Sequence, residues 1–219
     1  LEEPPAHVIF ILATTEIEKV PETIVSRCQV FTFKKPNLTI LREMIQIVAV
    51  KEGFKIEPSG ADLIAMLGDG SFRDTHGILQ KVLSYSKDKK ISIKEIEAVT
   101  NAPSQLLVND FISSISTANI EKGFMSIRQA GSQNIDMALF LKLILVKLRT
   151  ILLLRYAPEM KKELLGEISE DDQEFLVNIL KEKSASLTSK TLEVLLEAGE
   201  SMKFSSVIEL PLELALVKI

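Results

Sequence analysis

The sequence is poor in the residues that build disulfide bonds, zinc sites and aromatic cores. One cysteine and two histidines exclude a disulfide framework and a zinc site of the usual Cys/His kind. With no tryptophan and only two tyrosines, the core must be mainly aliphatic. The near absence of cysteine fits a reducing compartment, so we predict a cytoplasmic protein.

Long apolar runs and a large net charge are missing as well. The most apolar stretch, residues 135–156, is broken by five charged side chains, Asp136, Lys142, Lys147, Arg149 and Arg155. We interpret these as the solvated side of a helix. We predict no membrane partner, because no window approaches the roughly 18 uninterrupted apolar residues of a membrane span. The formal net charge of −4 also argues against a protein that wraps nucleic acid.

The first 34 residues have the pattern of two strands joined by a turn. Residues 8–15 are apolar before they end in two threonines, which is typical of a strand covered on both faces. Pro21 predicts a short turn or helix, and residues 30–33 predict a second strand. Because open α/β sheets place ligand-facing residues at the carboxyl ends of their strands, this segment is a candidate edge of a nucleotide site.

The remainder of the chain predicts a mainly α fold in two further parts. A small helical domain is expected over residues 35–100, with Asn37 or Thr39 as an N-cap, Gly53 as a C-terminal glycine and a Ser92–Glu95 capping box. Its third helix is expected to bury Phe72. An all-helical domain is expected over residues 101–219, and it is richer in apolar residues than a bundle of this size needs, so we predict self-association there. The expected helices are about 39–52, 59–67, 71–86, 92–100, 104–116, 119–130, 135–156, 169–183, 188–203 and 208–218.

Several short motifs together carry a family resemblance. They are Leu1-Glu2-Glu3-Pro4-Pro5, Ala13-Thr14-Thr15, Val20-Pro21, Ser26-Arg27-Cys28 and Gly68-Asp69-Gly70-Ser71-Phe72-Arg73-Asp74. In this combination the sequence resembles the clamp-loader branch of the AAA+ ATPases, and most of all the gamma/tau type of subunit in bacterial DNA polymerase III. The resemblance implies three parts: remnant strands of a RecA-like α/β ATPase domain (1–34), a helical lid (35–100) and an oligomerisation collar (101–219).

The resemblance also implies a role for Arg27. In the family, the arginine of Ser-Arg-Cys is a finger that completes the ATP site of the neighbouring subunit, where it stabilises the charge that develops during phosphoryl transfer. The alternative reading from the residues alone is an arginine that braces the strand edge against Glu16, Glu18 or Glu22.

Two further residues are implied to face the subunit's own nucleotide. Thr15, with Thr14 as the second choice, resembles the sensor at a strand end that orients the attacking water, although threonine also favours strands on propensity alone. Arg73 resembles the lid arginine of the Gly-Ser-x-Arg-Asp motif, which reaches the ATP phosphates. The ordinary reading of the same motif is a Ser71 N-cap beside a solvated Arg73. This chain has Thr75-His76 where the family commonly has Ala-Leu, which leaves the packing of this helix open.

By resemblance, the parent protein uses ATP and Mg²⁺ to load a sliding clamp onto primer–template DNA for processive replication. Its implied partners are further copies of itself and the delta and delta-prime subunits. The family's phosphate-binding loop, zinc-binding cysteine module and Mg²⁺-binding acidic strand are not in this sequence. We therefore expect this chain alone to bind ATP weakly and to be inactive. The alternatives are an ATPase-silent stator of the delta-prime kind, a non-enzymatic helical scaffold and a helicase-like AAA+ motor.

Overall fold

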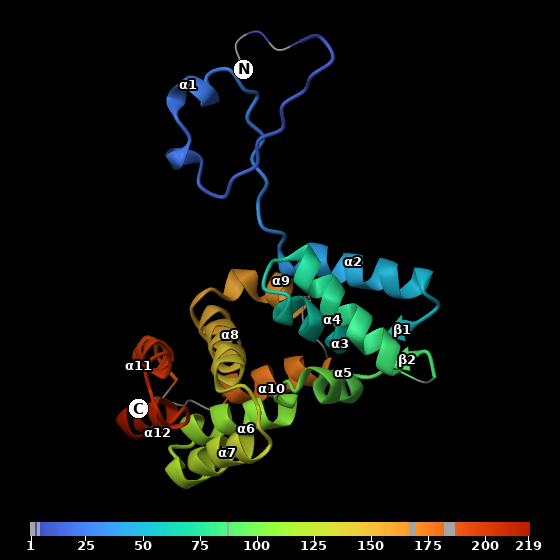
Figure 1. The fold of residues 1–219 in the computed structure, drawn as a ribbon. Coiled ribbons are helices and arrows are strands. Elements are labelled where there is room, and N and C mark those ends of the chain that lie inside the picture. Colours follow the sequence, from blue (N-terminus) through green and yellow to red (C-terminus); the bar gives the residue numbers. More distant parts are fainter. Residues whose placement is uncertain (1–2, 4, 87, 167–169, 182–186) are drawn as a thin grey trace. The chain divides into compact units, whose positions relative to one another are not determined.

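In the computed structural model the chain divides into two compact units, Leu1–Lys35 and Pro36–Ile219. The structure describes residues 3, 5–86, 88–166, 170–181 and 187–219. Helices dominate, which confirms the mainly α fold class (Figure 1). In chain order the elements are η1 (Ile17–Lys19), α1 (Glu22–Val25), α2 (Leu38–Lys51), β1 (Lys55–Ile56), α3 (Pro58–Leu67), α4 (Phe72–Tyr85), β2 (Lys90–Ile91), α5 (Ile93–Thr100), α6 (Gln105–Ser116), α7 (Ile120–Ser132), α8 (Met137–Tyr156), η2 (Pro158–Met160), α9 (Lys161–Gly166), α10 (Glu170–Lys181), α11 (Ser189–Met202) and α12 (Leu210–Lys218).

In the first unit the structure differs from the prediction of two strands. Residues 8–15 and 30–33 form no strand, and the ordered elements of this unit are the short helices η1 and α1. The apolar side chains that we expected to be buried in a covered strand are exposed to solvent: Ile9 is 87% exposed and Ile11 is 89% exposed. The physical reason is that a strand needs a hydrogen-bonded neighbour and an apolar cover. Within the described residues, β1 and β2 are the only paired strands.

Helices α2 to α5 pack around one apolar cluster, and residues 38–100 are called the lid below. The cluster includes Leu41, Ile45, Ile64, Leu79 and Ile96, all fully buried. The predicted local signals are confirmed: Asn37 Oδ1 accepts a hydrogen bond from the Ile40 amide at 2.9 Å, and Ser92 and Glu95 form a capping box. Gly53 takes the left-handed conformation (φ 78°) just after α2, as a C-terminal glycine should.

Two features of the lid differ from the sequence prediction. The two-residue strands β1 and β2 pair in parallel, with Lys55 opposite Lys90. Phe72 is 49% exposed rather than buried. It is the first residue of α4, so it lies at the end of the buried stripe of Thr75, Leu79 and Val82 rather than within it.

Helices α6 to α12 pack around a second apolar cluster, and residues 105–218 are called the collar below. At its centre the rings of Phe111 and Phe140 meet edge to face, with 5.7 Å between their centroids. Both ends predicted for the helix 169–183 lie outside the described residues. Among the described helices, none is both long enough and apolar enough to cross a membrane. The three-part domain division stays a prediction.

Candidate functional site

Arg27 lies directly after the short helix α1 and is exposed. Its Nη1 donates a hydrogen bond to the Thr23 carbonyl oxygen at 2.6 Å, so the guanidinium folds back along its own helix. Thr14 accepts a hydrogen bond from the Glu16 amide at 3.0 Å, while Thr15 next to it is exposed. Thr14 therefore has a local hydrogen-bond partner, and both threonines are exposed.

The lid motif forms the turn between α3 and α4. Asp69 and Gly70 both have positive φ, 48° and 77°, which is a conformation that suits Asp and Gly. Ser71 Oγ accepts from the Asp74 amide at 3.2 Å, so the predicted N-cap is confirmed. Arg73 is exposed in the first turn of α4. The positive end of the helix dipole adds to its charge, so this end of the helix favours an anionic group.

Thr75 fits into the lid because Gly68 has no side chain. Thr75 is fully buried, and its hydroxyl donates to the Ser71 carbonyl oxygen at 2.7 Å. A Cβ added to Gly68 would lie only 2.8 Å from Thr75 Cβ. The departure from the family's Ala-Leu at this point is therefore compatible with a well-packed helix.

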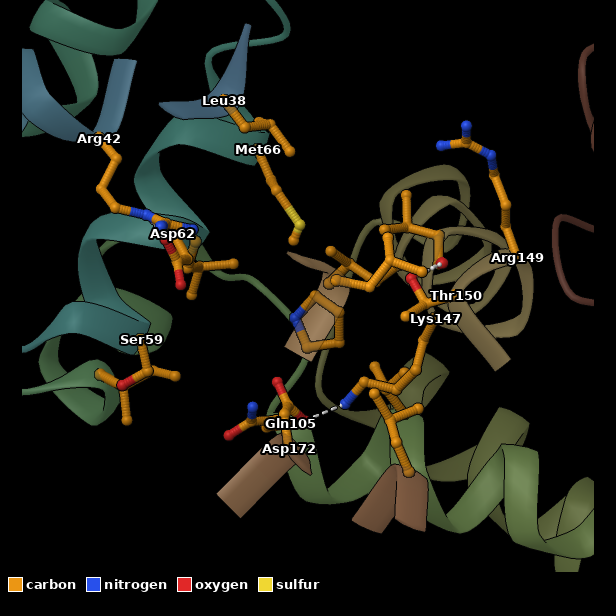
Figure 2. Close-up of a pocket in the computed structure, with 18 of the residues that line it drawn as sticks. Leu38, Arg42, Ser59, Asp62, Met66, Gln105, Lys147, Arg149, Thr150 and Asp172 are labelled. Carbon is orange, nitrogen blue, oxygen red and sulfur yellow. Dashed lines mark hydrogen bonds and ion pairs between the residues drawn. The ribbon is translucent and has the colours of Figure 1, made fainter. Parts of the chain in front are cut away.

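The lid and the collar line an open pocket of about 250 Å³ (Figure 2). Most of its lining is apolar, and each side carries one ion pair. On the lid side Arg42 of α2 pairs with Asp62 of α3. On the collar side Lys147 of α8 points toward Asp172 of α10, with 2.5 Å between Nζ and Oδ1.

The prediction that the charged residues of α8 are solvated is wrong for Lys147. Its side chain is only 13% exposed, donates to Asn109 Oδ1 at 2.7 Å and lies over the Phe175 ring. The sequence contains a signal for this burial. Phe140, Ile144, Lys147, Ile151 and Leu154 follow one another at spacings of four and three, so Lys147 occupies the buried stripe of the helix.

The surroundings of Lys147 contribute to the pH dependence of stability. Burial lowers the pKa of Lys147 below its ordinary value, and the charge and hydrogen bond of Asp172 offset part of this effect. The unfolded chain therefore holds a proton on this lysine at pH values where the folded chain has lost it. Stability consequently rises with pH between the lowered pKa and the ordinary value of about 10.4.

We predict that Asp172→Asn destabilises the second unit by about 1–2 kcal/mol at pH 7, because Lys147 then keeps a hydrogen-bond acceptor but loses its counter-charge. The pKa of Lys147 should fall further, so the pH range in which stability rises should begin at a lower pH than in the wild type. Urea denaturation from pH 7 to 10 measures both effects. Lys147→Met is the control, and its stability should lack this rise. Parallel profiles for all three proteins would contradict the prediction.

Several known proteins are similar to this chain. A family model described as "DNA polymerase III, delta subunit" matches residues 1–37. The DNA polymerase III subunit tau of Bacillus subtilis is 31% identical over 100% of this chain and 38% of its own length. The subunit gamma/tau of Mycoplasma genitalium is 36% identical over 65% of this chain and 24% of its own length. The Bacillus subtilis DNA clamp loader delta protein matches 94% of this chain and 63% of that chain, with a TM-score of 0.45 and 18% identity.

The chain spans about a quarter to two fifths of the length of these curated relatives. The match to tau runs through the whole chain, so it includes the Ser26-Arg27-Cys28 motif, the lid turn and the collar. The gamma/tau match agrees with the resemblance carried by those motifs. The chain is therefore a clamp-loader gamma/tau-like region.

Proposed function

We propose that the protein acts as an ATPase subunit of a bacterial replicative clamp loader. ATP and Mg²⁺ would drive loading of a sliding clamp onto primer–template DNA in the cytoplasm. In this proposal Arg27 acts in the ATP site of a neighbouring subunit, while Thr15 and Arg73 act at the subunit's own ATP. The observation that carries the proposal is the similarity to a tau subunit along the entire chain. The exposed positions of Arg27 and Arg73 support it, because both guanidinium groups are accessible to a ligand.

The direct test is clamp loading by a reconstituted complex. The full-length protein is assembled with delta and delta-prime subunits and supplied with clamp, primed DNA and ATP. ATP-dependent transfer of a fluorescent clamp onto the DNA is the expected result. A complex that assembles but transfers no clamp would contradict the proposal.

The collar has an exposed apolar surface on α12 and in the residues that follow α11. Helix α12 buries Leu212 and Leu216 in the bundle, yet Leu214 and Val217 on its other side are 54% and 60% exposed. Phe204, which follows α11, is 88% exposed. A helix that is apolar on both sides is typical of one covered in an assembly. We propose that this surface contacts the collars of other clamp-loader subunits, including copies of the same protein.

We predict that Leu214→Glu weakens self-association at least tenfold, because it places a charge in a contact that excludes water. Size-exclusion chromatography with light scattering over a range of concentrations measures the effect. Leu106→Glu is a matched control, since Leu106 is 73% exposed on α6, away from the α11–α12 surface. Equal association of both variants would argue against this surface, and a wild-type chain that stays monomeric at high concentration would argue against self-association.

A further inference from the structure

The turn that carries the lid arginine is held by the collar. Lys142 of α8 extends to Asp69, with 2.7 Å between Nζ and Oδ1. The two residues are 73 positions apart in the sequence. Asp69 is the central residue of the Gly68-Asp69-Gly70 turn, four residues before Arg73. The sequence interpretation of Lys142 as a merely solvated charge missed this contact.

The beginning of α8 contacts the lid at one other point, and the loop before α8 contacts the residue that follows the lid. Leu139 packs against the apolar cluster of the lid. Just before α8, the Asn134 carbonyl oxygen accepts a hydrogen bond from Asn101 Nδ2 at 2.5 Å. Lys142 therefore belongs to a joint between α8 and the lid, and its ion pair is the part of the joint that reaches the arginine's turn.

Hydrogen bonds and packing connect the residues from Gly68 to Thr75 to one another. The Ser71 amide donates to the Gly68 carbonyl oxygen at 2.8 Å, and both the amide and the hydroxyl of Thr75 donate to the Ser71 carbonyl oxygen. Thr75 also packs directly against Gly68. A displacement of Asp69 is therefore passed to Arg73, because the residues between them are tied to one another.

We propose that Lys142 is a positioning residue, which fixes the position of Arg73 for the nucleotide through its ion pair with Asp69. The inference rests on the proposed function, in which Arg73 contacts the ATP phosphates. It adds a route by which the arrangement of the collar acts on the ATP site through α8. Because the pair is exposed, its effect should be moderate, about twofold to fivefold.

A double-mutant cycle in the full-length protein, assembled into the loader, tests this coupling. Asp69→Asn removes the charge but keeps a residue that tolerates positive φ, and Lys142→Met keeps the length of the side chain. We expect each to raise the KM for ATP about twofold to fivefold with little change in kcat. The double variant should be no worse than Lys142→Met alone, because both changes remove the same ion pair.

Asp110 and Lys122 provide the matched control. They form an ion pair between α6 and α7 of the collar at 2.8 Å, with side chains 41% and 44% exposed. Asp110→Asn and Lys122→Met should leave the KM unchanged. Amide hydrogen exchange of residues 71–75 gives a readout without nucleotide: it should quicken about twofold to fivefold in Asp69→Asn and Lys142→Met, but not in the controls.

The two proposals fail in different ways. If Arg73→Ala raises the KM while Asp69→Asn and Lys142→Met do not, the positioning role of Lys142 is overturned and the proposed function stands. If Arg73→Ala leaves the KM unchanged, the nucleotide role of the lid arginine is lost, and the role of Lys142 falls with it. Additive effects in the double variant would also overturn the positioning role, because they would show that the two residues act separately.

Discussion

Arg27→Ala in every copy of the subunit should lower the ATPase rate of the assembled loader on the order of 10³-fold. This is the lower end of what an arginine supplied from a neighbouring subunit contributes to phosphoryl transfer. ATP binding should change far less, because the finger stabilises charge that develops only in the transition state. A single-turnover hydrolysis measurement, paired with a nucleotide-binding titration, separates the two effects.

The structure makes Arg27→Ala easy to interpret. Arg27 is exposed, and its contact with the Thr23 carbonyl oxygen is a local hydrogen bond within four residues. Because Arg27 is exposed and lies in the first unit, the substitution should leave the fold of Pro36–Ile219 intact. Arg27→Lys should recover little activity, since an ammonium group cannot reproduce the planar fork of a guanidinium. Arg128→Ala, an exposed arginine on α7, should keep full activity. An Arg27→Ala complex with wild-type hydrolysis would remove the finger from the proposed function and favour a structural brace.

Much of the helical fold was predictable because its signals are local. Apolar periodicity and caps depend on residues within a few positions of one another, and they located α2 to α8 and α10 to α12 closely. The parallel pair of β1 and β2 was missed because each strand has only two residues and the partners lie 35 positions apart. For residues 8–15 the error is the opposite, because a strand was predicted and none forms. Their pattern is that of a strand, but a pattern becomes a strand only when another segment pairs with it.

The candidate site also has features that could be predicted from the sequence and features that could not. The motifs around Arg27 and Arg73 could be recognised from the sequence, and their roles stay predictions. The burial of Lys147 could have been found, because it lies on the apolar stripe of α8. The ion pair between Lys142 and Asp69 could not be predicted, because it depends on how α8 packs against the turn between α3 and α4. Tertiary packing decides which charges on an amphipathic helix are solvated and which are held.

Gly68→Ala should lower the free energy of unfolding of the second unit by about 2–3 kcal/mol, the cost typical of overpacking a buried site. For a unit of this size that corresponds to roughly 5–10 °C in Tm. The added Cβ would lie 2.8 Å from Thr75 Cβ and 3.0 Å from Thr75 Cα, and closer still to the hydroxyl oxygen. The backbone of α4 cannot give way as the end of a flexible side chain could, so the turn between α3 and α4 must shift. Thermal and urea denaturation measure the loss.

Gly77→Ala is the matched control, because Gly77 is exposed inside the same helix and an added Cβ would meet nothing within 4 Å. It should stabilise the protein by about 0.5–1 kcal/mol, since alanine has the higher helix propensity. Adding Thr75→Ala to Gly68→Ala should restore part of the stability, because it removes the hydroxyl contact and leaves the contact with Cβ. If Gly68→Ala were as stable as Gly77→Ala, the turn would have to be looser than its packing indicates. A loose turn could not carry the position of Asp69 to Arg73, so this measurement also bears on the role of Lys142.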